Sequence, residues 1–170
     1  MKTTPKKFNQ RQSRESGFNL VEIIVAASIL MVSLLSVVVI AGQSITISHR
    51  SLNTYIASTL LEEGAEAVRT VRDNAWTNIS SLTAGTTYYP KFTTGTNVWS
   101  LTTTSSDGTV GVFTRTVVFS AVTRDGSSNI ASSGTPDSGT KLVTVTVSWT
   151  EANGGSISKT LSFYITDMFS

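Results

Sequence analysis

The chain has 170 residues, which is enough for one domain of ordinary size but too few for two such domains. It contains no cysteine, so structural disulfides, thiolate metal sites and cysteine nucleophiles are excluded. Its formal net charge is +2, but residues 1–17 carry five basic side chains and one acidic one, a balance of +4, which leaves −2 for the remaining residues. A basic face for nucleic acid is therefore not expected in the body of the chain.

An uncharged and mostly apolar run follows the basic segment. All 25 positions from Ile23 to Ile47 lack a charged side chain. As a helix, residues 18–41 would be about 36 Å long, which exceeds the roughly 30 Å hydrocarbon core of a bilayer. No proline interrupts this segment, so its backbone can satisfy its own hydrogen bonds in lipid. The basic residues before it predict an N-terminus in the cytoplasm and a C-terminal domain outside.

A secretory signal peptide is a different interpretation of the same segment. The apolar core of such a signal is only about 7–15 residues long, and a small-x-small cleavage site follows it closely. The run from Ile23 to Gly42 is longer than this, and no such site follows within a few residues. An exported protein that loses its first 42 residues remains an alternative, which N-terminal sequencing of the mature chain would settle.

Glu22 is the acidic exception at the start of the apolar run. A charged side chain at the centre of a membrane helix costs about 2.5–3.5 kcal/mol, so an acidic residue there usually has a partner. Two interpretations are open. Glu22 either lies close enough to the cytoplasmic interface to reach water, or pairs with a cation that another molecule supplies.

The sequence Ser16-Gly17-Phe18-Asn19-Leu20-Val21-Glu22 resembles the cleavage and methylation motif of type IV pilins and type II secretion pseudopilins. In that family a basic leader ends in Gly, the next residue is usually Phe, and a Glu occupies the fifth mature position. The resemblance implies that a membrane prepilin peptidase cleaves between Gly17 and Phe18 and methylates the new amine of Phe18. Residues 1–17 would then be the leader.

The resemblance also implies a role for Glu22 in filament assembly. The Phe18 ammonium of an incoming subunit would pair with Glu22 of its neighbour in lipid, where an unmatched carboxylate is unfavourable. The implied partners are other pilins or pseudopilins, an inner-membrane assembly platform and its ATPase. The chain would start as a single-pass inner-membrane prepilin and end in a cell-surface or periplasmic filament, with a minor subunit expected. Asn19 and Ile23 depart mildly from the Thr or Ser and the Leu usual in the family.

The helical pattern continues beyond the apolar run, and a helix is predicted from Phe18 to Trp76. No proline occurs from Ser44 to Trp76, and apolar residues recur at spacings of three and four. Residues 18–41 would be the membrane and assembly half, and residues 42–78 an amphipathic extension. Gly42, with Gly64 further out, is the obvious weak point. The predicted apolar stripe is Leu52, Tyr55, Ile56, Leu60, Ala67, Val68, Val71 and Ala75.

The opposite face of this extension is charged. Glu66–Arg69 and Arg69–Asp73 fall at the i,i+3 and i,i+4 spacings that favour ion pairs on an exposed helix. Its acidic residues could be proposed as a metal site, but we interpret them as a solvated helix face. They are Glu62, Glu63, Glu66 and Asp73.

After Asn78 the composition changes, and residues 80–170 contain 36 serines and threonines. Strand signals replace helical ones, and the linker Glu151–Ser156 predicts an antiparallel hairpin. The fold class is α+β: a long N-terminal helix packed on an antiparallel sheet formed by residues 79–170. The resemblance implies a three-strand, pilin-like sheet. Strands are predicted at 86–92, 97–103, 110–123, 142–150 and 158–166, with Phe113, Val117, Phe119, Ala121, Val143, Val145, Val147, Trp149, Leu161, Phe163 and Ile165 facing inward.

A long loop rich in Ser, Gly and Asp is predicted from Arg124 to Thr140. Asp125, Asn129 and Asp137 could supply oxygen ligands to calcium, but their spacing matches no EF-hand-like pattern. We interpret the loop as a surface for a neighbouring subunit or a target, and no cofactor is expected.

The sequence offers little for catalysis. Its single histidine, His49, has no recognisable triad partners, and there is no phosphate-cradling loop, HExxH motif or zinc ligand set. We therefore expect no enzyme. Two classes of function remain. The chain is either a structural subunit of a filament or an anchored surface adhesin or DNA-capture module. Glu22 and Gly17-Phe18 favour the filament subunit, because a simple anchor needs none of them, whereas nothing distinguishes a pilus from a pseudopilus.

Overall fold

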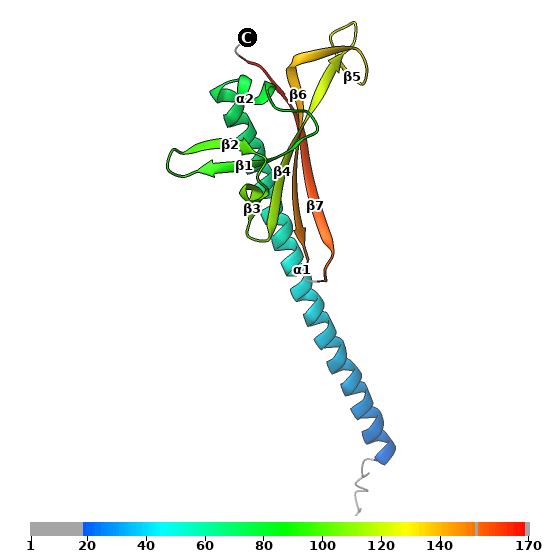
Figure 1. Cartoon of the computed structure of the whole chain (residues 1–170). Helices are drawn as coiled ribbons and strands as arrows, with labels where there is room; N and C mark the ends of the chain where they lie inside the picture. Colours follow the sequence, from blue (N-terminus) through cyan, green and yellow to red (C-terminus); the bar gives the residue numbers. More distant parts are fainter. Residues whose placement is uncertain (1–18, 152, 169–170) are drawn as a thin grey trace, which may run out of the picture. The chain divides into compact units, whose positions relative to one another are not determined.

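The computed structural model describes residues 19–151 and 153–168. A long helix, α1 (Leu20–Asn74), and a short one, α2 (Thr77–Ser80), precede an antiparallel sheet, as Figure 1 shows. The chain divides into two compact units between Ile47 and Ser48. The predicted α+β class, with a long N-terminal helix packed on an antiparallel sheet, is confirmed.

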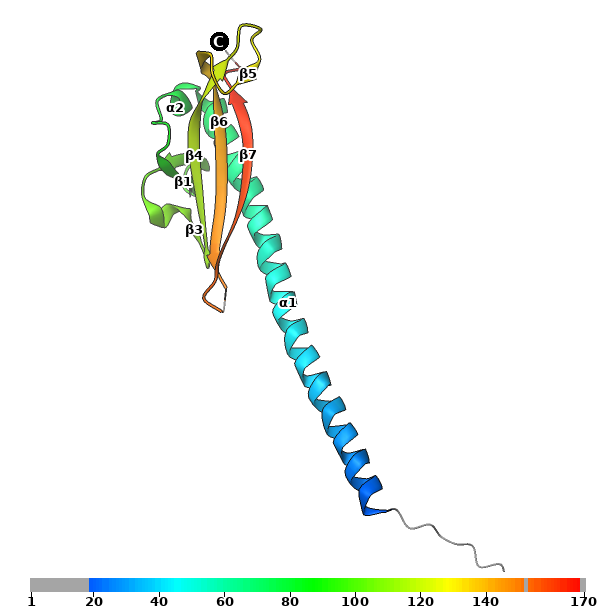
Figure 2. The same ribbon diagram turned by 90° about the vertical axis from the view of Figure 1, so that its right-hand side faces the viewer.

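The sheet is larger than the three strands that the resemblance implied. Its main path runs β2-β1-β4-β6-β7, and β3 and β5 each pair with β4. The long strands β4, β6 and β7 lie side by side (Figure 2). The strands are β1 (Thr87–Thr93), β2 (Val98–Thr102), β3 (Thr109–Val110), β4 (Phe113–Arg124), β5 (Ile130–Ala131), β6 (Thr135–Thr150) and β7 (Ser156–Thr166), with a 3-10 turn, η1, at Ser105–Gly108.

The core lies between the second half of α1 and the inner faces of β4, β6 and β7. Alternation along the strands places every second side chain toward the helix, and Val117, Phe119 and Val143 are fully buried there. The inward prediction is confirmed for the four residues of β6 and for Ile165, whereas Leu161 is 37% exposed. The residues of α1 that reach this core are Ala57, Leu60, Leu61, Gly64, Ala65, Ala67, Val68 and Val71.

The predicted apolar stripe is therefore buried only between Leu60 and Val71. Leu52 and Tyr55 are 53% and 71% exposed, because the buried part of the helix begins at Ala57. The helix also ends before the predicted Trp76, since α1 stops at Asn74 and Trp76 caps α2. Ala75 lies between the two helices and is exposed.

The predicted strand 110–123 begins too early, because β4 starts only at Phe113, and it misses a bulge near its end. Gly111 has a positive φ of 61°, a conformation that glycine adopts at little cost, and it turns the chain between β3 and β4. The pairing of β4 with β6 shifts between Ala121 and Val122. This bulge reverses the alternation, so Ala121 is exposed and Val122 is buried, contrary to the inward prediction for Ala121.

The predicted loop from Arg124 to Thr140 is also wrong over much of its length. It contains β5, and β6 already begins at Thr135, opposite Arg124. Strand β7 joins β6 only from Thr140 onward. The first residues of β6 therefore pair with β4 but not with β7. A strand segment with a neighbour on one side only tolerates polar residues, and these residues led to the prediction of a loop.

Candidate functional site

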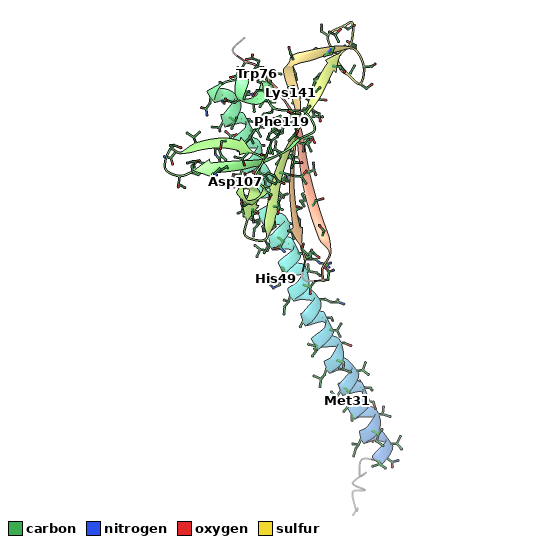
Figure 3. All side chains as sticks on the ribbon, in the orientation of Figure 1. Met31, His49, Trp76, Asp107, Phe119 and Lys141 are labelled. Atoms are coloured by element: carbon green, nitrogen blue, oxygen red, sulfur yellow. The ribbon has the colours of Figure 1, made fainter. Side chains whose placement is uncertain are left out.

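The N-terminal half of α1 presents an apolar surface on all sides. Its large apolar side chains, from Leu20 to Ile47, are between 52% and 72% exposed. Figure 3 shows them radiating from the helix, with Met31 labelled. The helix is long and apolar enough to cross a membrane by its length and composition. Such a surface is stable only in lipid or against other apolar helices.

The hydroxyl groups of this segment are satisfied by its own backbone. Each Ser or Thr between Leu20 and Ile47 donates a hydrogen bond to the carbonyl oxygen four residues earlier, at oxygen–oxygen distances of 2.7 to 3.1 Å. This bonding removes the main cost of placing a hydroxyl in an apolar environment. The residues are Ser28, Ser33, Ser36, Ser44 and Thr46.

Glu22 differs from these hydroxyl residues. It lies in the first turn of α1, where its backbone N–H donates to the carbonyl of Asn19 at 2.8 Å. The positive end of the helix dipole favours a carboxylate in this turn. Within residues 19–151 and 153–168, the side chain forms no ion pair and no hydrogen bond. The carboxylate is therefore available to a cation from outside the described chain.

A shallow, open hollow of about 470 Å³ lies beside Glu22. Its lining residues recur at spacings of three and four, so they form one face of the helix. The small side chain of Ala26, one turn beyond Glu22, leaves room next to the carboxylate. An apolar helix could pack on this face while a cation on it meets Glu22. The lining residues are Asn19, Val21, Glu22, Val25, Ala26 and Ile29.

The other two predicted site residues, Gly17 and Phe18, lie outside the described residues. The predicted cleavage bond and the predicted methylated amine therefore remain predictions. His49 lies on α1 and is exposed, as its label in Figure 3 indicates.

Two of the three calcium candidates, Asp125 and Asp137, accept hydrogen bonds from protein donors, and the side chain of Asn129 donates one to Asp125. One oxygen of Asp125 accepts hydrogen bonds from the backbone N–H groups of Ser127 and Asn129 at 2.8 and 2.9 Å. These bonds, first that from Asn129 and then that from Ser127, hold the pKa of Asp125 below its ordinary value. Asp137 instead accepts from Nε of Arg124 at 2.6 Å. In the described part of the chain, no group of three or more His, Cys, Asp or Glu side chains is placed to hold a metal ion.

The charged face of α1 follows the predicted spacing only in part. Arg69 and Glu66 form the predicted ion pair at 3.4 Å. Asp73 pairs with Arg72 at 2.7 Å instead of with Arg69, because Arg69 also lies over the ring of Phe163, at 5.1 Å from its centroid.

Arg115 is a charged residue that the sequence analysis missed. It lies on β4 and is only 3% exposed, with its Nη1 atom 3.3 Å from Oε1 of Glu63. The signal was present in the sequence, because Arg115 alternates with the inward residues Phe113 and Val117. A charged residue at an inward position of a strand predicts a buried charge that needs a partner.

Comparisons of this chain with protein-family models, with curated proteins and with solved structures give no match. The chemistry of the site must therefore be argued from the chain's own residues.

Proposed function

We propose that this chain is a structural subunit, of the minor kind, of a type IV pilus or secretion pseudopilus filament. One observation carries the proposal. Glu22 is the charged residue of an exposed apolar helix, and it has no partner among the described residues, whereas each hydroxyl of that segment bonds its own backbone. A chain that needed only an anchor would not require a carboxylate in this position.

The proposed partner of Glu22 is the methylated amine of Phe18 on an adjacent subunit. Cleavage after Gly17 would create this amine, which stays cationic after methylation. In lipid both charges lose their hydration, so each depends on the other, and only a stack in the correct register would bring them together. Val25 and Ile29, which line the same hollow, would provide the apolar contact between the helices.

The proposed topology places the basic residues 1–17 in the cytoplasm and the sheet domain outside. A prepilin peptidase would remove the leader at the membrane. An assembly platform and its ATPase would then extract the subunit from the membrane into the filament. Pilus and pseudopilus share all of these steps.

The test is the amount of this protein in filaments sheared from cells, relative to the amount in the membrane fraction. Glu22→Gln keeps the shape and removes the charge, and we expect it to lower incorporation sharply, with Glu22→Ala behaving alike. Glu62→Gln makes the same chemical change at an exposed carboxylate of the same helix and should incorporate normally. Intact mass spectrometry should show loss of residues 1–17 and gain of one methyl group in all of these chains.

Two results would contradict the proposal. If the Glu22 variants enter filaments as well as the parent chain does, the charge pair does not drive assembly. If the parent chain itself occurs in no filament fraction, an anchored adhesin or DNA-capture module becomes the better interpretation.

A further inference from the structure

Gly64 lies where α1 passes close to the sheet. A Cβ atom at this position would come within 2.8 Å of Cγ1 of Val145 and 2.9 Å of Cδ of Arg115. Both distances are shorter than real Cβ contacts allow, and both neighbours lie in the packed core. The missing side chain of Gly64 therefore makes room for the aliphatic part of Arg115.

The guanidinium group of Arg115 is held between the helix and the β1–β2 hairpin. Its Nη1 atom lies 3.3 Å from the Glu63 carboxylate, and its Cζ atom lies 5.3 Å from the centroid of the Trp99 ring. Neither Nε nor Nη1 makes a well-aligned hydrogen bond within the described chain. A buried guanidinium with so few acceptors depends strongly on the one carboxylate beside it.

The burial of apolar residues already favours one position of α1 along the sheet. Sliding the helix by one turn, about 5.4 Å, would bring an apolar residue or a glycine to most of its buried positions. However, a slide in one direction would bring Glu63 to the buried position of Ala67, and the opposite slide would bring Arg69 to that of Ala65. These buried charges, together with the changes of side-chain volume, disfavour the shifted registers.

The contacts of Arg115 add to this preference, because they too match only one register. A shift of one turn would place Leu60 or Val68 where Gly64 now accommodates the arginine stem. It would also place Thr59 or Ala67 where Glu63 now meets the guanidinium. The shifted arrangements would combine a steric clash with a buried, unpaired charge, and each of these is costly.

We propose that Arg115 is a positioning residue that locks the register of α1 on the sheet, by shape through Gly64 and by charge through Glu63. The role of the pair is to favour one arrangement of helix and sheet, and this role does not require a net gain in stability. The lock belongs to residues 48–170 and does not depend on the proposed filament function.

The register can be measured by cross-linking, because the chain has no cysteine of its own. In the native register Nε of Arg50 lies 3.1 Å from the Glu151 carboxylate. Arg50→Cys with Glu151→Cys therefore reports that register, when a short thiol-specific reagent is applied to the full chain in detergent micelles. Thr46→Cys or Thr54→Cys with Glu151→Cys reports the two registers shifted by one turn.

We expect the native pair to dominate when Arg115 and Glu63 are present. Arg115→Met keeps most of the side-chain length without the charge, and Glu63→Gln removes the anion alone. Each should raise the yield of a shifted product about tenfold, the size expected when a coupling near 1.4 kcal/mol is lost. The charge swap Glu63→Arg with Arg115→Glu should restore much of the native pattern. Glu62→Gln, the same substitution as Glu63→Gln at the neighbouring exposed carboxylate of α1, should leave the pattern unchanged.

Unchanged cross-linking in both Arg115→Met and Glu63→Gln would overturn the proposal. It would show that the two side chains fill space in the core without determining the register of the helix. Glu63→Gln decides the outcome if Arg115→Met does not fold, since the Glu63 side chain is 44% exposed and its replacement preserves volume. An effect of Glu62→Gln equal to that of Glu63→Gln would also overturn it.

Discussion

At the scale of single residues, two glycines of α1 offer a matched comparison. Gly64 has Val145 and Arg115 within 3 Å of the position of a Cβ atom, whereas Gly42 has nothing within 4 Å. Gly64 was expected to be a weak point of the helix, but it is a point of close contact between helix and sheet. Glycine suits this position because it leaves space for the neighbouring side chains, and not because it makes the helix flexible.

We expect Gly64→Ala to lower the free energy of unfolding by about 1–3 kcal/mol, since overpacking a tight core has this cost. Helix propensity alone would act in the opposite direction, by about 1 kcal/mol. Denaturant unfolding of the full chain in micelles measures the change. Gly42→Ala is the control and should not destabilise the sheet domain. Equal behaviour of the two variants would show that the core accommodates a methyl group at Gly64.

Trp149 is the largest side chain of β6 and packs deep in the core. It is 3% exposed, and its ring centroid lies 5.6 Å from that of Phe113. Trp149→Ala should lower the free energy of unfolding by about 3–5 kcal/mol, because it removes buried aromatic surface and leaves a cavity. Tyr164→Ala, at a site that is 51% exposed, should cost much less. A small effect at Trp149 would mean that the core collapses around the missing ring.

At the scale of elements, the first residues of β6 are joined to β4 by a carboxylate. The hydroxyl of Thr140, then Arg124, holds the pKa of the Asp137 carboxyl below its ordinary value of 3.8, and burial opposes them. The same carboxylate accepts a hydrogen bond from the backbone N–H of Gly139 at 2.9 Å. Because the folded pKa is the lower one, these contacts stabilise the fold above pH 3.8, and the stabilisation is lost as the pH falls through the folded pKa.

We therefore expect the amide resonance of Gly139 to titrate with a midpoint below pH 3.8. A series of NMR spectra at decreasing pH measures this midpoint. Asp137→Asn should abolish the transition, because an amide does not titrate. A midpoint above 3.8 in the parent chain would contradict the arrangement around Asp137.

Another element-scale feature is the sheet face opposite α1, where hydroxyl residues of neighbouring strands stand opposite each other. Thr144 pairs with Ser162 and Thr146 with Thr160 in the register of β6 and β7. Their hydroxyl oxygens lie 3.2 and 3.3 Å apart. Cross-strand hydroxyl pairs of this kind stabilise a sheet modestly. Part of the Ser and Thr content of the domain is thus explained by strands with one apolar and one hydroxyl-bearing face.

At the scale of the whole molecule, the chain combines two units with different surroundings. Residues up to Ile47 form one unit, and those from Ser48 onward form the other. The buried core residues all belong to the second unit, so its core does not require the apolar half of α1.

A fragment that comprises residues 48–170 should therefore be soluble and folded without detergent. Far-UV circular dichroism should show both helix and strand, and denaturant unfolding should be cooperative. The full chain is the control and should require detergent, because the apolar side chains before Ser48 are exposed. A fragment that aggregates or lacks a helical signal would mean that the first half of α1 contributes to the fold of the second.

The sequence by itself determined the features that depend on local periodicity. Spacings of three and four predicted α1, and strict alternation predicted the inward residues of β6, because both patterns report how a face of one element is buried. The linker Glu151–Ser156 predicted the hairpin of β6 with β7. The leader motif stays a prediction, because Gly17 and Phe18 lie outside the described residues. Only the tertiary structure decided the features that depend on partners distant in sequence. Three such features arise at contacts between elements: the bulge at Ala121, the early start of β6 at Thr135 and the Arg115–Glu63 pair. Local composition carries little information about contacts between elements that are distant in the sequence.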